Sequence, residues 1–411
     1  MKSVLYVTTT FPTLAAFIEN EVLRLVERGV RIRVLTLRSV SRNYQPRYAP
    51  LVERTMSVGN PLDPRGWLAL LGWLARRPHV LVPEMARILW ASRSSLYALV
   101  GHVGYLPAAA RIASIAERED FERIHGVWAH FPATAAYLAA RLTGRRFSMS
   151  GHAGSDLHRT RAFLAEKARA ADFVNCCVRQ NAEMLSTLAG PPARVEWIYH
   201  GTDLSRFDGA GRHRAPEPTL AIVGRLAATK GFEDAVLALG ELKRRGVEAK
   251  LSVVGDGPLR PTLEHLAREQ GVEDRITFHG ALSHEELLPV YRRAWLLVAP
   301  CRVLANGRQD GIPNVVVEAM AMKLPCVGTR IPGLEEAIVS GQTGAICEGG
   351  DPVVLAQAIE SLLAAPAELE RMGEAARTRA LERFDFDRNF ERLWSLFTGE
   401  TDQRDRAAVN G

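Results

Sequence analysis

Cysteine is scarce in this sequence, and long apolar runs are absent. The five cysteines are an odd number and lack the spacing of metal ligands: Cys176, Cys177, Cys301, Cys326 and Cys347. We therefore expect reduced core thiols in a cytoplasmic protein. No stretch approaches the roughly 18–20 apolar residues that span a bilayer, and residues 1–7 indicate a first strand without the cleavage pattern of a signal peptide. The protein is expected to be soluble or peripheral to a membrane.

Blocks of a single charge are also missing. The net charge is +6, but the arginines are spread along the chain and form no basic arm. This distribution disfavours nucleic acid as a partner and suits anionic substrates or an anionic membrane surface. With 47% hydrophobic and 24% charged residues, the composition is typical of a folded globular protein. The 411 residues exceed the roughly 250–300 of a single core, so we expect two domains.

Strand-like and helix-like patterns alternate along most of the chain. Ser3 to Val7 precedes an amphipathic stretch over residues 17–28, and a second alternating set begins at Leu220. This order predicts an α/β protein with two Rossmann-like, doubly wound parallel-sheet domains. We expect an N-terminal domain over 1–207, a linker rich in Gly, Pro and charge over 208–218, a C-terminal domain over 219–384, a helix over 385–399 and a disordered tail over 400–411.

The segment 61–118 interrupts this alternation and is predicted to be helical. One interpretation is that its apolar side chains dip into a bilayer surface while Arg65, Arg76 and Arg77 meet anionic headgroups. The apolar residues concerned are Trp67, Leu70, Leu71, Trp73 and Leu74. The alternative is a set of core-packed helices in the first domain, because apolar residues at helical spacing more often belong to a core.

Two carboxylates stand eight positions apart, Asp310 and Glu318, in the run GRQDGIPNVVVEAM over 307–320. Pro313 suits a first helical turn because its missing N–H would be unpaired there. The open N–H groups around Asn314 and Val315 can hold an anion. Asp310 precedes the predicted helix and Glu318 lies more than a turn inside it, so one carboxylate would meet a hexose and the other a ribose. The pattern indicates a site for a sugar nucleotide.

Two cations lie at a second strand end. Arg225 follows an apolar run, and Lys230 comes just before an amphipathic stretch over 232–245. A strand, a short step and a helix would direct both side chains to one point. An arginine fork and a lysine point charge suit a diphosphate, although exposed basic residues are commonly only solvated.

These motifs resemble family 4 of the retaining glycosyltransferases, which have the GT-B fold. The runs LSVVGDGP (251–258), FHG (278–280) and PGLEE (332–336) also match, in the order of the family, and several motifs in register are a strong signal. The first half is similar to the bacterial exopolysaccharide, or colanic-acid, branch. The resemblance implies two domains facing a cleft, a C-terminal helix that crosses back to the first domain, and chemistry without a metal or other cofactor.

The resemblance also implies roles for individual residues. The donor site would be formed by Gly224, Arg225, Lys230, Gly280, Ala281, Leu282, Gly311, Ile312, Pro313, Asn314, Val315 and Glu318. The catalytic residues would be His152, Asp310 and Glu318. Possible acceptor-side residues are Phe11, His130 and Asp156. Both histidines follow predicted strands, where such sheets bind ligands; each has the alternative of a structural loop histidine.

The expected function is transfer of a hexosyl unit from a UDP- or GDP-sugar to a growing, lipid-linked bacterial exopolysaccharide or other cell-surface glycan. The partners would be the donor, the lipid-linked acceptor and the inner face of the cytoplasmic membrane. Two alternatives stay open at this point. One is a sugar-nucleotide epimerase or hydrolase of the same fold, and the other is a non-catalytic, nucleotide-sugar-binding membrane scaffold subunit. The sequence leaves open the base, the sugar, the acceptor and the oligomeric state.

Overall fold

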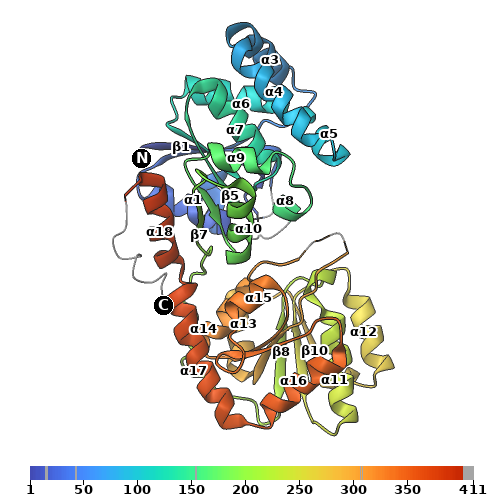
Figure 1. Ribbon diagram of the computed structural model, residues 1–411. Coiled ribbons are helices and arrows are strands. Elements are labelled where there is room, and N and C mark those ends of the chain that lie inside the picture. The colour runs from blue at the N-terminus through green and yellow to red at the C-terminus, as the bar shows by residue number, and fades with distance from the viewer. Residues whose placement is uncertain (14–16, 42–43, 153–154, 306, 308, 401–411) are drawn as a thin grey trace. The chain divides into compact units, whose positions relative to one another are not determined.

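The computed structural model describes residues 1–13, 17–41, 44–152, 155–305, 307 and 309–400. The predicted tail beyond residue 400 lies outside the described residues. The chain divides into a first unit, made of Met1–Tyr199 and the chain from Phe390 onward, and a second unit, His200–Asn389. Each unit contains one parallel sheet with flanking helices (Figure 1). This confirms the predicted α/β class with two Rossmann-like domains.

The first unit is built on a seven-stranded sheet with the order β3-β2-β1-β4-β5-β6-β7. Its strands are β1 (Ser3–Phe11), β2 (Arg31–Val40), β3 (Thr55–Ser57), β4 (Arg123–Val127), β5 (Arg146–Gly151), β6 (Val174–Cys176) and β7 (Val195–Trp197). The helices are α1 (Phe17–Glu27), α2 (Ala49–Val52), α3 (Pro64–Arg76), α4 (Pro78–Ser92), α5 (Leu96–Gly104), α6 (Leu106–Arg118), α7 (Phe131–Thr143), α8 (Ser155–His158), α9 (Leu164–Ala170) and α10 (Arg179–Ala189).

The centre of this unit is buried because small residues let a helix approach the sheet. Helix α7 is rich in alanine, and nearly all of its residues are buried. A Cβ on Gly126 of β4 would lie 2.5 Å from the Cα of Ala133. Glycine at that position therefore permits close contact between α7 and β4, which fixes where the ends of β4 and β5 present their loops.

Helices α3, α4, α5 and α6 occupy the segment that was expected to be helical. Trp73 is 1% exposed and donates its indole N–H to Ser114 Oγ over 3.0 Å, so its assignment to a bilayer-facing set was wrong. Leu70 is partly buried as well. The reason is that α3 packs one face on α6, and Trp73 lies on that face. Trp67 and Leu71 remain exposed.

The lengths and compositions of the helices bear on membrane insertion. In the described part of the chain, no single helix is both long and apolar enough to cross a bilayer. Two bent helix pairs reach the required length and composition together: Leu96–Gly104 with Leu106–Arg118, and Pro352–Leu363 with Pro366–Arg383.

The second unit is built on a six-stranded sheet with the order β10-β9-β8-β11-β12-β13. Its strands are β8 (Thr219–Val223), β9 (Lys250–Val254), β10 (Ile276–Gly280), β11 (Leu296–Ala299), β12 (Cys326–Thr329) and β13 (Gly344–Cys347). The helices are α11 (Phe232–Arg244), α12 (Arg260–Glu269), α13 (His284–Arg293), α14 (Asn314–Ala321), α15 (Pro332–Ala337), α16 (Pro352–Leu363) and α17 (Pro366–Arg383).

The last helix, α18 (Phe386–Thr398), begins in the second unit, and its residues from Phe390 onward belong to the first. The Phe397 ring lies 5.2 Å from the rings of His125 and Phe173, measured between centroids. Phe390 and Leu393 are also buried. The apolar face of this helix is thus part of the core of the first unit.

All five cysteines are buried thiols, and none forms a disulfide. Cys176 and Cys177 lie in the first unit, and Cys301, Cys326 and Cys347 lie in the second. This agrees with the prediction of reduced core residues.

Candidate functional site

In the second unit, the loops after β8 and β11 bring together two of the predicted charges. Lys230 Nζ lies 3.4 Å from Asp310 Oδ1, and the two side chains are 22% and 25% exposed. Asp310 Oδ2 is buried and has no hydrogen-bond partner among the described residues. Arg225 is exposed and has no carboxylate partner in the described part of the chain. These groups are available to a polar ligand at the carboxyl ends of the strands, where this class of sheet binds ligands.

Glycines allow the loops of this site to pack closely. Gly231 has φ +66° (left-handed), and a Cβ there would lie 1.8 Å from the carbonyl oxygen of Pro300. A Cβ on Gly333 of α15 would lie 2.1 Å from the carbonyl oxygen of Gly311. A side chain at either position would push the loops apart, because no Cβ fits at such distances. The glycines thereby hold the backbone that carries Lys230 and Asp310.

Glu318 is on the buried face of α14 and is 5% exposed. Its Oε2 accepts a hydrogen bond of 3.0 Å from the Tyr291 hydroxyl. Its Oε1 lies 3.9 Å from His284 Nε2, a side chain that is 45% exposed. Burial raises the pKa of Glu318 from 4.5 to about 7, and the bond from Tyr291 opposes this. Glu318 thus has one oxygen fixed by Tyr291 and a second directed toward His284.

The start of α14 differs by one residue from the prediction. Pro313 is the N-cap, with φ −68° and ψ 128°, and Asn314 is the first helical residue. The extended ψ of Pro313 keeps it outside the first turn, although its carbonyl accepts a 3.0 Å bond from Val316 N. Asp310 precedes the helix and Glu318 is its fifth residue, as expected.

The predicted base-reading segment follows β10. Gly280 has φ +74° and its carbonyl accepts from Gly255 N over 2.7 Å. Ala281 is exposed and Leu282 is partly buried. The loop ends at a capping box, in which Ser283 and Glu286 bond each other's backbone at the start of α13. This cap fixes the start of the helix that carries His284 and Tyr291.

Sequence reasoning missed Tyr291, His284 and Cys301. The spacing of His284 and Tyr291 was a usable signal, because residues seven apart share a helix face. The Cys301 thiol is 3% exposed; burial raises its pKa to about 12, Lys230 opposes the shift and Asp310 adds to it. The thiol is therefore neutral and lies beside the charged pair Lys230 and Asp310.

The first unit holds the predicted acceptor-side residues. Asp156 is 1% exposed, and its Oδ2 accepts from the backbone N–H of His152 over 2.8 Å and of Ala129 over 3.2 Å. It therefore ties together the loops after β4 and β5. The His152 ring is 5% exposed and lies 4.4 Å from the ring of Trp128 and 5.2 Å from that of Phe17.

His130 is the N-cap of α7, and burial, reinforced by Lys167, lowers its pKa to about 3. Its ring is therefore neutral near pH 7. Phe11 has no exposed surface, so in this conformation its side chain does not reach an acceptor. The predicted role of Phe11 is restricted to shaping the loop that follows β1.

Lys167 of α9 is a further buried charge that the sequence did not reveal. Its Nζ donates to Ala129 O over 2.5 Å, to His130 O over 3.1 Å and to Thr134 Oγ1 over 2.9 Å. Burial lowers the pKa of Lys167 to about 7. The ammonium group stabilises the turn between β4 and α7 through these three hydrogen bonds.

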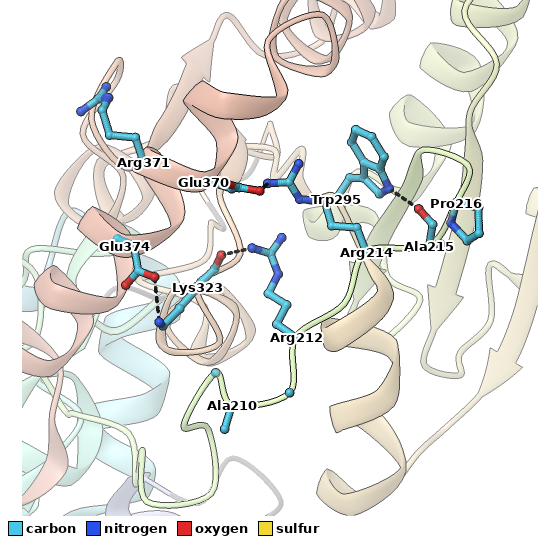
Figure 2. A pocket seen from close by; sticks show the side chains of 12 residues that line it. Ala210, Arg212, Arg214, Ala215, Pro216, Trp295, Lys323, Glu370, Arg371 and Glu374 are labelled. Atoms are coloured by element: carbon cyan, nitrogen blue, oxygen red, sulfur yellow. Dashed lines mark hydrogen bonds and ion pairs between the residues drawn. The ribbon is translucent and has the colours of Figure 1, made fainter.

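A pocket of about 990 Å³ in the second unit contains none of the predicted donor residues (Figure 2). It is lined by Gly209, Ala210, Gly211, Arg212, Arg214, Ala215 and Pro216 together with Trp295, Lys323, Glu370, Arg371 and Glu374. Its charges are already paired: Arg214 lies 3.1 Å from Glu370, and Lys323 lies 2.7 Å from Glu374. Arg212 donates to the carbonyl oxygens of Lys323 and Ala294. These contacts attach residues 208–218, the predicted linker, to the second unit.

Comparison with known proteins assigns the family. The family model of glycosyl transferases group 1 matches residues 206–379. A GDP-mannose-dependent alpha-(1-6)-phosphatidylinositol monomannoside mannosyltransferase of Mycolicibacterium smegmatis is 30% identical over 310 residues, which cover 72% of this chain and 81% of the relative. The chain belongs to the group 1 glycosyltransferases. This group 1 glycosyltransferase is thus an enzyme that transfers a sugar from a nucleotide sugar.

Other relatives of this glycosyltransferase have different names. N-acetyl-alpha-D-glucosaminyl L-malate synthase of Bacillus anthracis is 30% identical over 299 residues, which cover 68% of this chain and 75% of the relative. Solved structures share the GT-B fold at low identity. The lipopolysaccharide outer core galactosyltransferase WaaB has a TM-score of 0.72 at 13% identity, covering 97% of this chain and 100% of WaaB. Anabaena HepE in complex with UDP has 0.71 at 16%, with the same coverage. The exopolysaccharide branch stays a prediction.

Proposed function

We propose that this glycosyltransferase moves a hexosyl unit from a UDP- or GDP-sugar, with retention of configuration, to a lipid-linked saccharide of a bacterial cell-surface glycan such as an exopolysaccharide. The observation that carries the proposal is the pairing of Lys230 with Asp310 at 3.4 Å in the unit that also buries Glu318. The name of the Mycolicibacterium relative, which contains both GDP-mannose and phosphatidylinositol, supports a lipid-borne acceptor. The reaction takes place at the inner face of the cytoplasmic membrane.

The leaving diphosphate is stabilised by the two cations. As the glycosidic bond to the donor breaks, negative charge grows on the leaving phosphate oxygen. Arg225 lies in the loop after β8, Lys230 ends a 3-10 helix (Ala228–Lys230), and both side chains are accessible to solvent, so they meet this charge without rearrangement of the fold. The N–H groups at the start of α14 add to it. Donors that are fixed in advance act most strongly where charge develops in the transition state.

The carboxylates position the donor. Asp310 accepts hydrogen bonds from hexose hydroxyls, and the diphosphate replaces it as the partner of Lys230. Glu318 accepts from the ribose diol through Oε1, because Oε2 is held by Tyr291. The acceptor hydroxyl attacks from the side on which the diphosphate departs, and the leaving oxygen takes its proton. In the first unit, His152 takes part in catalysis, as the resemblance implies, while His130 and Asp156 shape the loops of the acceptor side.

The reaction needs no metal or other cofactor in this proposal. The chain contains an Asp-x-Asp tripeptide, Asp385–Asp387, but Asp385 Oδ1 accepts from Arg388 N over 2.9 Å at the start of α18. That carboxylate caps a helix. The cations of the donor site supply the charge that a divalent ion would otherwise provide. Full turnover in EDTA is the expected result, and loss that Mg²⁺ or Mn²⁺ restores would contradict this part.

Calorimetric titration with UDP, GDP, ADP and dTDP tests the donor site. We expect one nucleotide to bind, binding to be lost in Glu318→Ala, and binding to be kept in the matched control Glu374→Ala, whose carboxylate is exposed and pairs with Lys323. Absence of binding by the folded protein for every nucleotide would overturn the proposed site. Transfer is then tested with the matching sugar nucleotides and lipid-linked saccharides. A released or isomerised sugar without acceptor would instead indicate a hydrolase or epimerase.

A further inference from the structure

Exposed large apolar side chains are concentrated in one part of the first unit. In the described part of the chain there are thirteen such side chains, and ten of them lie between residues 62 and 103. These ten are Leu62, Trp67, Leu68, Leu71, Leu74, Val82, Trp90, Leu96, Val100 and Val103. Apolar surface of this extent on a soluble domain marks an interaction site.

Nine of the ten side chains form one stripe on each of three helices, and Leu62 lies just before the first of them, α3. On α4, Val82 and Trp90 are two turns apart, and on α5 Leu96, Val100 and Val103 follow helical spacing. On α3 the exposed positions between Arg65 and Arg76 carry no polar side chain. Each stripe therefore occupies one helix face.

The three stripes face outward from the same layer. Helix α3 packs on α6, α4 packs on α7 and α5 packs on both, while α4 also contacts α3 and α5. Figure 1 shows α3, α4 and α5 as the outer layer of the first unit over α6 and α7. The buried residues of these helices, such as Trp73, Ile88 and Ala98, occupy the inner faces. The apolar stripes consequently lie on the side directed away from the core.

The exposed charges of α3, α4 and α5 are of one sign. Residues 60–104 contain two carboxylates, Asp63 and Glu84, whose side chains are 12% and 3% exposed. Asp63 pairs with Arg111 over 2.5 Å, and Glu84 accepts from Tyr137 over 2.6 Å. Neither presents a negative charge to a partner.

Arginines supply the exposed charge of the same layer. Arg77 and Arg93 are exposed and, among the described residues, have no carboxylate partner. Arg93 also stacks on Trp90 at 4.0 Å from the ring centroid. The layer therefore carries exposed cationic side chains as well as exposed apolar ones.

We propose that the outer face of α3–α5 docks this enzyme on an anionic phospholipid surface. Apolar side chains with tryptophan enter the region between headgroups and acyl chains, and the arginines bind the lipid phosphates. A second copy of the chain would bury the apolar stripes but would bring like charges together. A negatively charged bilayer satisfies both the apolar and the cationic part of the surface. The docking proposal rests on the proposed function in one respect: docking would bring the enzyme to a lipid-linked acceptor.

Co-sedimentation with phosphatidylcholine vesicles, with and without phosphatidylglycerol, tests the docking. We expect the full chain to bind the anionic vesicles and to bind neutral ones weakly. Trp67→Ser with Trp90→Ser should lower the partition coefficient by about tenfold or more. Arg77→Gln with Arg93→Gln should lower binding to the anionic vesicles by about fivefold for each arginine. The control, Val353→Ser with Leu381→Ser, removes exposed apolar side chains from the second unit and should bind as the parent does.

Binding to anionic vesicles that these variants leave unchanged, or absence of binding by the parent, would overturn the proposal. So would a stable dimer, seen by light scattering, that dissociates in the tryptophan variant, since it would assign the face to a second copy. Circular dichroism and nucleotide titration of each variant show that the fold and the donor site are intact. A protein that binds vesicles but no nucleotide would refute the proposed function alone, and the reverse result would refute the docking alone.

Discussion

The two units use charged residues at their strand ends in different ways. In the second unit, Lys230 and Asp310 face each other at 3.4 Å with about a quarter of each side chain exposed. In the first unit, Asp156 and Lys167 are almost completely buried, and both bind backbone groups. A charge that is bound by its own backbone holds loops in place, whereas a charge that still meets solvent is available to a ligand. The same sheet edge can therefore serve as scaffold in one unit and as site in the other.

The largest effect should come from a lysine of the second unit. We expect Lys230→Met to lower kcat/KM by about 100- to 1,000-fold, because one fixed donor to developing charge contributes this much. The unfolding midpoint should change little, since the lysine is partly exposed. The control is Lys250→Met, because the Lys250 side chain is 54% exposed and pairs with the surface residue Glu217. Equal losses of kcat/KM in Lys230→Met and Lys250→Met would contradict the assignment of Lys230 to a ligand site.

Lys167, the buried lysine of the first unit, should affect stability instead of catalysis. Lys167→Met removes the donor to two carbonyls and a hydroxyl, and we expect the free energy of unfolding to fall by about 2–4 kcal/mol because buried acceptors lose their partner. Urea denaturation measures this change. Lys250→Met, which removes a 54% exposed lysine paired with Glu217, serves as control. Nucleotide affinity of the folded variant should match the parent, and a selective loss of affinity would assign Lys167 to the site.

The pH dependence of donor binding should be moderate and should arise from Glu318. Its folded-state pKa is raised to about 7, so its carboxyl is protonated below this value and ionised above it. The ionised form accepts hydrogen bonds from a diol, and affinity should therefore rise about tenfold from one pH unit below the pKa to one unit above it. The sign is opposite for stability, which this group favours below pH 4.5 and which falls as the pH rises toward 7. Titrations of Glu318→Gln should show neither trend.

Tyr291→Phe should give the smallest effect. The hydroxyl donates to Glu318 Oε2 and lowers its pKa, so its removal should move the midpoint of donor binding to higher pH. The loss of one such bond corresponds to about 1 kcal/mol. Phe207 lies edge-on to the Tyr291 ring, and the packing should survive. A midpoint that stays in place would show that the hydroxyl does not control the carboxylate.

The sequence was informative where function imposes a motif and less so where packing decides. The alternating pattern predicted both sheets, and the spacing of Asp310 and Glu318 predicted their places before and within a helix. It did not reveal that Tyr291 binds Glu318, because that contact depends on how α13 lies against α14. Nor did it separate Trp73, which is buried, from Trp67, which is exposed on the same helix. The hydrophobic character of the two residues is identical, and only the position of α6 distinguishes them.

The five buried thiols make the two units separately observable. A thiol reagent reacts with a buried cysteine only when the surrounding structure opens. Cys176 and Cys177 would report openings of the first unit, and Cys301, Cys326 and Cys347 would report those of the second. Mass spectrometry of the labelled peptides would therefore time the opening of each unit in one sample of the native chain. If added nucleotide slowed the labelling of Cys301 alone, the nucleotide would be bound near Cys301, because it would suppress local opening there.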